Sequence, residues 1–193
     1  LGSFKIRAGA NAIETANKAS LRNGVVTASA GNFGQGVAQA AVSRGLSVDV
    51  IAPDTASVVK LEALHKLGAR VKTVSFDDWW EVMVSRSPGV DGFFIHPVEE
   101  LSVIMGNGGI GLEIVNQFPQ VDVVVVPVGG GGMISGIALA MKALGKRPRI
   151  IACEIESSTP LFSAKLAGKP VKVSRGPSWI DGIGSTSVLP KMW

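Results

Sequence analysis

Cysteine and histidine are scarce in this sequence. Among 193 residues there is one cysteine, Cys153, and there are two histidines, His65 and His96. A single cysteine cannot form an internal disulfide, so we expect a reducing, cytoplasmic environment, with Cys153 buried in a strand within the apolar run 149–155. Neither histidine has a Cys or His companion at the spacing of metal ligands, so we interpret both as packing residues.

Charged residues and long apolar runs are also few. Charged residues make up 18% of the chain and the net charge is +4, with Lys and Arg scattered rather than gathered in a patch with aromatic residues. This pattern argues against nucleic-acid binding, and a small anionic ligand accounts for the positive charge more simply. The longest apolar run, 121–128, has the length of a strand, so we expect no membrane span.

Apolar residues are abundant, at 46% of the chain. Short β-branched runs alternate with helical patterns, which predicts an α/β fold with parallel sheets covered by helices on both faces. The expected strands are 25–29, 47–53, 70–76, 92–97, 121–128 and 149–155. The expected helices are 35–44, 57–67, 77–85, 112–118 and 133–144. Such an apolar composition also favours an extensive partner interface, and we expect a homo-oligomer.

Two glycine-rich loops follow predicted strands. Four consecutive glycines, 129–132, lie between the run 121–128 and the helical stretch 133–144, and a second loop, 30–34, follows the strand at 25–29. Backbone N–H groups without side chains approach an anion closely, and a helix N-terminus adds a favourable field, so the four glycines predict a phosphate site. Because ligands gather at the carboxyl ends of parallel strands, both loops could face one ligand.

The segment 99–111 is less regular. Residues 106–111 match the G-x-G-x-x-G pattern of dinucleotide sites, but no clear strand runs into them and the acidic residue that would hold a ribose is missing. We interpret this segment as a hinge or connection between two lobes.

Lys5 directly precedes an alanine-rich stretch, 6–12, that is predicted to be helical. Together with 29–36 and 127–136, the motif Ser3-Phe4-Lys5 resembles the fold-type II pyridoxal-phosphate enzymes, the tryptophan synthase β-like class of two-lobed open parallel sheets. Within that class the chain is most similar to the threonine and serine dehydratase branch, which includes serine racemase. The resemblance extends over essentially the whole chain, and four plain glycines favour the dehydratases over the related sulfhydrylases.

The resemblance implies a role for each motif. Lys5 would condense with the aldehyde of pyridoxal 5'-phosphate and then remove the substrate α-proton, and Phe4 would pack beside the cofactor ring. The cofactor phosphate would be held by Gly129, Gly130, Gly131, Gly132 and Met133. Asn32 would bind the ring hydroxyl, and the substrate carboxylate would be held by Ser29, Ala30, Gly31 and Asn32.

The implied reaction is elimination of the β-hydroxyl from a threonine- or serine-type amino acid, to give a 2-oxo acid and ammonia. Serine racemases carry a serine at the position of Ala30, so we do not expect racemisation. Glu154 matches a cation ligand of some members, but Pro160 stands where a second carboxylate is usual. We therefore expect no metal, and a buried acid at a strand end instead.

The resemblance also implies two lobes with the cofactor between them. The larger lobe would comprise 1–22 and 106–193, and the smaller lobe would comprise 23–105. Family members have further segments before the lysine and after the position of Trp193, so this chain resembles the middle of such an enzyme. The alternative to a dehydratase is therefore a non-catalytic remnant that mainly self-associates through an uncovered sheet edge.

Overall fold

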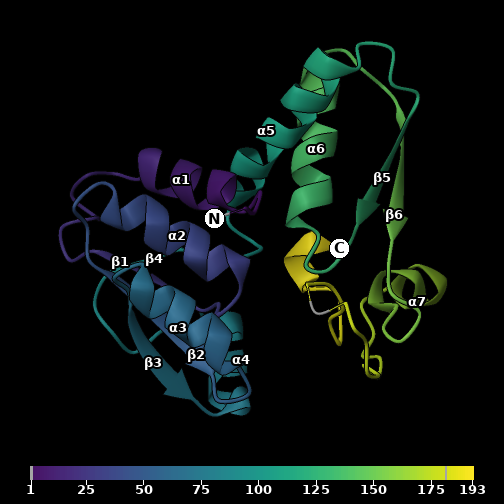
Figure 1. Cartoon of the computed structure of the whole chain (residues 1–193). Coiled ribbons are helices and arrows are strands. Elements are labelled where there is room, and N and C mark those ends of the chain that lie inside the picture. Colours follow the sequence, from purple (N-terminus) through teal and green to yellow (C-terminus); the bar gives the residue numbers. More distant parts are fainter. Residues whose placement is uncertain (1, 181) are drawn as a thin grey trace. The chain divides into compact units, whose positions relative to one another are not determined.

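A computed structural model describes residues 2–180 and 182–193 (Figure 1). The chain divides into two compact units, residues 1–106 and 107–193. The alternation of strands and helices predicted from the sequence is confirmed, and the strands within each unit are parallel.

The first unit contains a four-stranded parallel sheet in the order β3-β2-β1-β4. Its strands are β1 (Val25–Thr27), β2 (Val48–Pro53), β3 (Arg70–Val74) and β4 (Phe93–Phe94). Its helices are α1 (Ile6–Glu14), α2 (Asn32–Val42), α3 (Val58–Lys66) and α4 (Phe76–Ser85). Each strand follows a helix or loop that returns the chain to the same edge, as parallel pairing requires.

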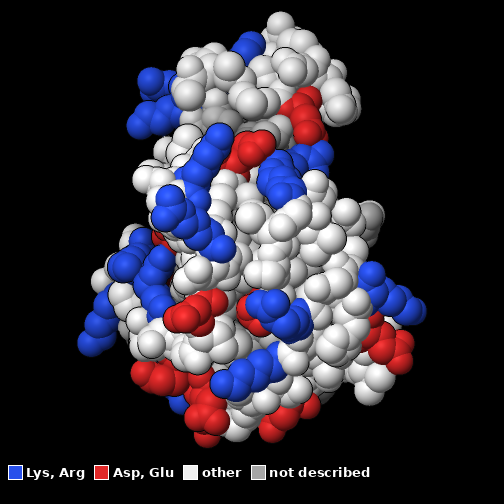
Figure 2. Space-filling model, turned by 90° about the vertical axis from the view of Figure 1, so that its left-hand side faces the viewer, with Lys and Arg blue, Asp and Glu red and all other residues white. Residues whose placement is uncertain are grey.

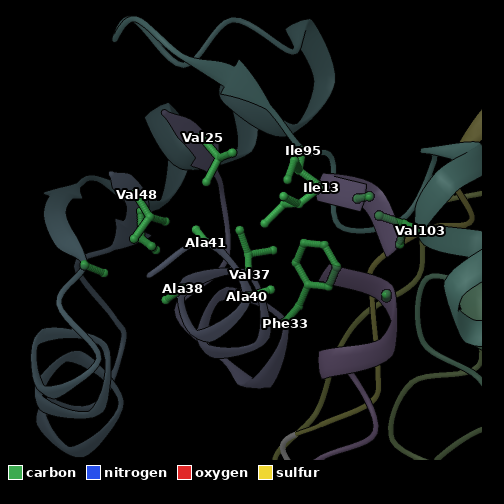
Figure 3. Close-up of a cluster of buried hydrophobic side chains, with 14 of the residues drawn as sticks. Ile13, Val25, Phe33, Val37, Ala38, Ala40, Ala41, Val48, Ile95 and Val103 are labelled. Carbon is green, nitrogen blue, oxygen red and sulfur yellow. The ribbon is translucent and has the colours of Figure 1, made fainter. Parts of the chain in front are cut away.

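Helices pack on both faces of this sheet. The larger core joins Val25 and Val48 of the sheet to Phe33 and Val37 of α2 and to Ile13 of α1 (Figure 3). On the other face, a smaller cluster of Val26, Ala28 and Ile51 packs against Met83, Trp79 and Trp80 of α4. Strands β1 and β2 are therefore buried on both sides, as their apolar sequences predict.

The second unit contains a parallel pair, β5 (Val123–Pro127) and β6 (Arg149–Cys153). Its helices are α6 (Gly132–Ala143), α7 (Pro160–Ala167) and a short 3-10 turn (Pro190–Met192). The core of this unit brings Val124 and Val126 against Ile137 and Met141 of α6. The other face of β5 is open: Val125 is 60% exposed. The expectation of strands covered on both faces is therefore wrong for β5, and Cys153 is half-buried rather than buried.

Helix α5 (Leu101–Gln117) carries the chain from the first unit into the second. The expectation of irregular structure at 99–111 is wrong, because α5 is continuous through the glycine-rich residues. The segment does connect two parts of the chain, because the change of unit after Gly106 falls within it. A Cβ at Gly106 would lie 2.6 Å from the carbonyl oxygen of Arg7, and one at Gly111 would lie 2.9 Å from that of Ile137. Close packing against α1 and α6 explains the glycines and offsets their low helix propensity.

Helix α7 was not expected from the sequence either. It begins with Pro160 and ends at Ala167, and the next residue, Gly168, has a left-handed φ of +67°. Proline at the first helical position and glycine just past the last are ordinary boundary signals. The eight-residue helix lacks a strong apolar repeat, which explains why the sequence did not reveal it.

Residues 2–22 lie in the first unit, because α1 packs lengthwise on α2. The change of unit after Gly106 falls close to the predicted lobe boundary. The assignment of 1–22 and 106–193 to one lobe and of 23–105 to the other stays a prediction. In the part of the chain that the structure describes, no helix is long and apolar enough to cross a membrane.

Charges are dispersed over the surface. On the face seen in Figure 2, Lys and Arg side chains alternate with Asp and Glu side chains across a largely uncharged surface. Several are paired, as in Arg44 with Glu14 at 3.2 Å and Arg70 with Asp49 at 2.5 Å. This dispersal agrees with the scattered cations of the sequence.

Candidate functional site

Lys5 lies at the N-terminal end of α1 with its side chain half-buried. Its Nζ lies 4.7 Å from the centroid of the Phe4 ring, and among the described residues no carboxylate pairs with it. Burial lowers the pKa of the Lys5 amine below its ordinary value. A larger fraction of this amine is therefore neutral near pH 7, and the neutral form is the nucleophile.

The loop from Ser29 to Asn32 follows β1 and opens α2. Gly31 caps the helix in an extended conformation, Ala30 is 7% exposed, and the exposed Asn32 is the first helical residue. The first N–H groups of a helix have no partner within it, so this loop presents donors to an anion such as a carboxylate.

Gly34 is a residue of this loop region that the sequence reasoning did not single out. A Cβ at Gly34 would overlap the carbonyl oxygen of Ser29, so only glycine lets the chain fold back tightly here. The signal available in the sequence was a second glycine three residues after Gly31.

Lys5 and this loop are brought together within the first unit. A Cβ at Gly36 would lie 2.9 Å from the carbonyl oxygen of Lys5, and one at Gly9 would lie 2.8 Å from the backbone nitrogen of Val37. The backbone at Lys5 therefore lies against α2, one helical turn beyond Asn32.

The four glycines lie in the second unit, between β5 and α6. Gly131 has a left-handed φ of +89° and accepts a backbone hydrogen bond from Ser135, and the buried Gly132 begins the helix. A Cβ at Gly131 would lie 3.3 Å from Cε of Met192. The turn thus needs glycine at this point, and the first N–H groups of α6, including that of Met133, have no acceptor within the helix.

These residues fit the groups of pyridoxal phosphate. Lys5 offers an amine without a carboxylate partner, the turn at the start of α6 offers N–H groups for a phosphate, and Asn32 offers a side-chain amide that no described residue engages. Phe4, Lys5 and the loop from Ser29 to Asn32 belong to the first unit, whereas Gly129 to Met133 belong to the second. Their union in one site stays a prediction.

Asn107 on α5 was read from the sequence only as part of a hinge. It is 6% exposed, and its Oδ1 has no hydrogen-bond partner among the described residues. An unpaired buried amide oxygen costs about 1–3 kcal/mol. Such atoms are rare in folded proteins, and they are found where water or a ligand supplies the missing donor.

Glu154 has a structural role that its sequence position did not reveal. It follows β6, and its two carboxylate oxygens accept hydrogen bonds from the backbone N–H groups of Leu161, at 2.7 Å, and Phe162, at 2.9 Å. It therefore caps the N-terminus of α7, where a negative charge is favourable. Among the described residues there is no cluster of three potential metal ligands.

The two histidines differ. His96 is fully buried: its Nε2 lies 3.0 Å from the carbonyl oxygen of Met83, and its Nδ1 accepts from the N–H groups of Val98 and Glu99. The expected packing role is thus confirmed for His96. It is wrong for His65, which is exposed on α3.

Comparison with known families gives one match over the whole chain. The family model described as "Pyridoxal-phosphate dependent enzyme" matches residues 1–193. Among curated proteins, an L-threonine ammonia-lyase from Thermotoga maritima is 38% identical over 184 residues, which cover 94% of this chain and 46% of the relative. A serine racemase from Homo sapiens is 37% identical, over 96% of this chain and 56% of the relative.

Similar solved structures include the same two kinds of enzyme, a threonine deaminase and a serine racemase. Threonine deaminase isoform 2 from Solanum lycopersicum has a TM-score of 0.86 at 32% identity, over 96% of this chain and 55% of that chain. Serine racemase from Dictyostelium discoideum has a TM-score of 0.85 at 31% identity, over 99% of this chain and 62% of that chain. This chain therefore spans about half the length of the curated relatives it matches.

Proposed function

Because the chain belongs to the family of pyridoxal-phosphate-dependent enzymes, we propose that it is the amine-bearing part of an ammonia-lyase. The enzyme eliminates the β-hydroxyl of L-threonine or L-serine and yields a 2-oxo acid and ammonia. The observation that carries this proposal is the half-buried amine of Lys5, which has no carboxylate partner among the described residues. The backbone of Lys5 lies against the helix that begins at Asn32.

In the proposed reaction, different residues of this chain have different roles. The cofactor, when bound, supplies an aldehyde for the amine and a ring that takes up electrons from the broken C–H bond. Lys5, as a neutral amine, accepts the α-proton of the substrate. The N–H groups at the start of α2 would donate to the substrate carboxylate, and those at the start of α6 would hold the cofactor phosphate. The Asn32 amide would hold the ring hydroxyl.

Ala30 favours elimination over racemisation. A racemase needs a second proton donor on the opposite face of the substrate from the lysine, and the methyl group of Ala30 carries no exchangeable proton. Racemisation is the second candidate, because a serine racemase is 37% identical to this chain.

The test begins with the visible absorption spectrum of the purified protein after addition of pyridoxal phosphate. We expect a new band that is lost in Lys5→Ala, kept in the control Lys18→Ala, and changed by L-threonine or L-serine. Lys18 is a suitable control because it is exposed shortly after α1. Release of pyruvate and ammonia from L-serine supports the lyase, whereas D-serine without pyruvate supports a racemase. Absence of a Lys5-dependent band favours the non-catalytic alternative.

A further inference from the structure

Helix α1, which carries Lys5, is held from a second side by α5. We propose that Asn11 and Gly106 are positioning residues, which fix α1 against α5 and thereby hold the Lys5 amine in its half-buried setting. This inference rests on the proposed role of Lys5 as the reacting amine.

The first contact is a hydrogen bond over a long sequence separation. Asn11 Nδ2 donates to the carbonyl oxygen of Ser102 at 2.7 Å, and the two residues are 91 positions apart in the chain. Ser102 lies in the first turn of α5. This hydrogen bond fixes both side-chain torsion angles of the half-buried Asn11. It therefore limits how far α1 can slide or rotate along α5.

The second contact is made by backbone atoms. A Cβ at Gly106 would lie 2.6 Å from the carbonyl oxygen of Arg7 and 2.8 Å from Cβ of Asn11. Gly106 follows Ser102 by four residues, as Asn11 follows Arg7, so each pair lies on one face of its helix. The hydrogen bond and the close approach therefore form one joint between the two helices.

The opposite side of α1 is closed by α2. Gly9 and Gly36 bring the two backbones together there, and Gly36 lies directly against the carbonyl oxygen of Lys5. Backbone contacts of this kind cannot relax by a change of rotamer, so α1 is held between two rigid surfaces. The start of α1, where Lys5 stands, is about 9 Å along the helix from Asn11, at 1.5 Å per residue.

A lysine side chain is long and flexible, so its amine has a defined position only if the lysine backbone is itself held in place. In the proposed reaction this amine must reach first an aldehyde and then an α-proton, and misplacement by about 1 Å can cost 100-fold in rate. If the contacts between α1 and α5 at Asn11 and Gly106 are lost, α1 can shift and the Lys5 amine becomes more exposed to water. The pKa of the amine then rises toward its ordinary value, because less of it is shielded from water.

The test measures the amine itself in the full chain, without cofactor. Competitive acetylation with acetic anhydride over a range of pH, with each lysine followed by peptide mass spectrometry, reports the pKa and reactivity of Lys5. Exposed Lys18 serves as the reference in the same sample. In Asn11→Ala we expect the Lys5 titration midpoint to rise by roughly half a unit or more, with Lys18 unchanged.

Asn17→Ala is the matched control. Asn17 follows the same helix and is exposed, and its Oδ1 accepts a short-range hydrogen bond from the Ala19 N–H at 2.9 Å. We expect this variant to titrate like the unchanged protein. A second variant, Asn11→Leu, keeps the branching at Cγ beside Gly106 and removes the hydrogen bond, and we expect it to shift the Lys5 midpoint in the same direction.

Several outcomes would overturn the proposal. These are an unchanged Lys5 midpoint in folded Asn11→Ala or Asn11→Leu, an equal shift in Asn17→Ala, and unfolding of both Asn11 variants by circular dichroism, which would make Asn11 a residue of general stability. Acetylation needs neither cofactor nor substrate. The acetylation titration and the activity assay are therefore independent. A protein without lyase activity can still show the Asn11-dependent shift, and an active lyase can lack it.

Discussion

At the scale of single residues, buried hydrogen bonds define the protonation states of the titratable groups. His96 accepts at Nδ1 from two backbone N–H groups and directs Nε2 to the Met83 carbonyl, so the neutral form with the proton on Nε2 satisfies every partner. Burial lowers the pKa of His96, with a smaller lowering from Arg86 that opposes the raising effects of the Met83 carbonyl, Glu99 and Glu100.

This arrangement predicts acid sensitivity. Because the pKa of His96 is lower in the folded state than the unfolded value of about 6.5, its contribution to stability is fully present above that value and is lost as pH falls toward the folded pKa. The loss is at most about 1.4 kcal/mol per pH unit. Urea unfolding at pH 7.5 and 5.5 measures it.

The two histidines make the control simple. We expect His96→Gln to be less stable than the unchanged protein at pH 7.5 and to lose less stability on acidification. We expect His65→Gln, at an exposed position, to lose as much stability on acidification as the unchanged protein does. An equal loss in all three proteins would contradict this account of His96.

At the scale of elements, helix ends and helix crossings explain most differences from the sequence-based expectations. The glycines of α5 suggested a hinge because glycine is a poor helix former in isolation. In the structure Gly106, Gly108 and Gly111 lie where α5 meets another backbone, so close packing outweighs their low helix propensity. A short helix such as α7 depends equally on its cap.

For α5 we predict a graded response to alanine. A Cβ at Gly111 would lie 2.9 Å from the carbonyl oxygen of Ile137, whereas one at Gly108 would lie 3.2 Å from that of Gly136. We expect Gly111→Ala to destabilise the protein by about 1–3 kcal/mol despite its gain in helix propensity, and Gly108→Ala to do so less. Thermal unfolding followed by circular dichroism measures both, and a stabilised Gly111→Ala would show that α5 and α6 are not closely packed.

For α7 we predict dependence on Glu154. Glu154→Ala removes two hydrogen bonds to the helix N-terminus and a favourable negative charge, at an expected cost of about 1–2 kcal/mol. Glu154→Gln should cost less, because its amide keeps one oxygen acceptor. Glu156→Ala, at an exposed position two residues later, is the control, and urea unfolding compares the three. If Glu156→Ala costs as much as Glu154→Ala, the cap is not the cause.

At the scale of the whole molecule, the open face of β5 is the main departure from a fully covered parallel sheet. Val125 is 60% exposed and Val123 is 41% exposed, although their neighbours Val124 and Val126 are buried. Valines on a strand face normally pack against another layer. The chain spans about half the length of its curated relatives. The sequence led us to expect self-association through an uncovered sheet edge, and the exposed valines offer a sheet face as a different surface for it.

We therefore predict that this chain self-associates through the open face of β5. Val125→Lys should weaken association at least about tenfold, because a charge there is costly to bury. Val59→Lys, at a 74% exposed position on α3, should leave it unchanged. Sedimentation velocity over a range of concentrations measures this, and equal sedimentation of Val125→Lys and the unchanged chain would exclude this face as the interface.

Local patterns in the sequence determined the alternation of strands and helices, the glycine turn after β5 and the family. Each depends on residues that are neighbours in the chain: apolar runs, helix caps, and the motifs around Lys5, Asn32 and Gly131. The tertiary structure alone decided the continuity of α5, the capping of α7 by Glu154, and the position of α1, which Lys5 precedes, between α2 and α5. The α7 cap joins Glu154 to Leu161, seven residues later. The other two features depend on atoms distant in sequence, such as those of Asn11 and Ser102, and no local pattern records which backbones will meet closely enough to require glycine.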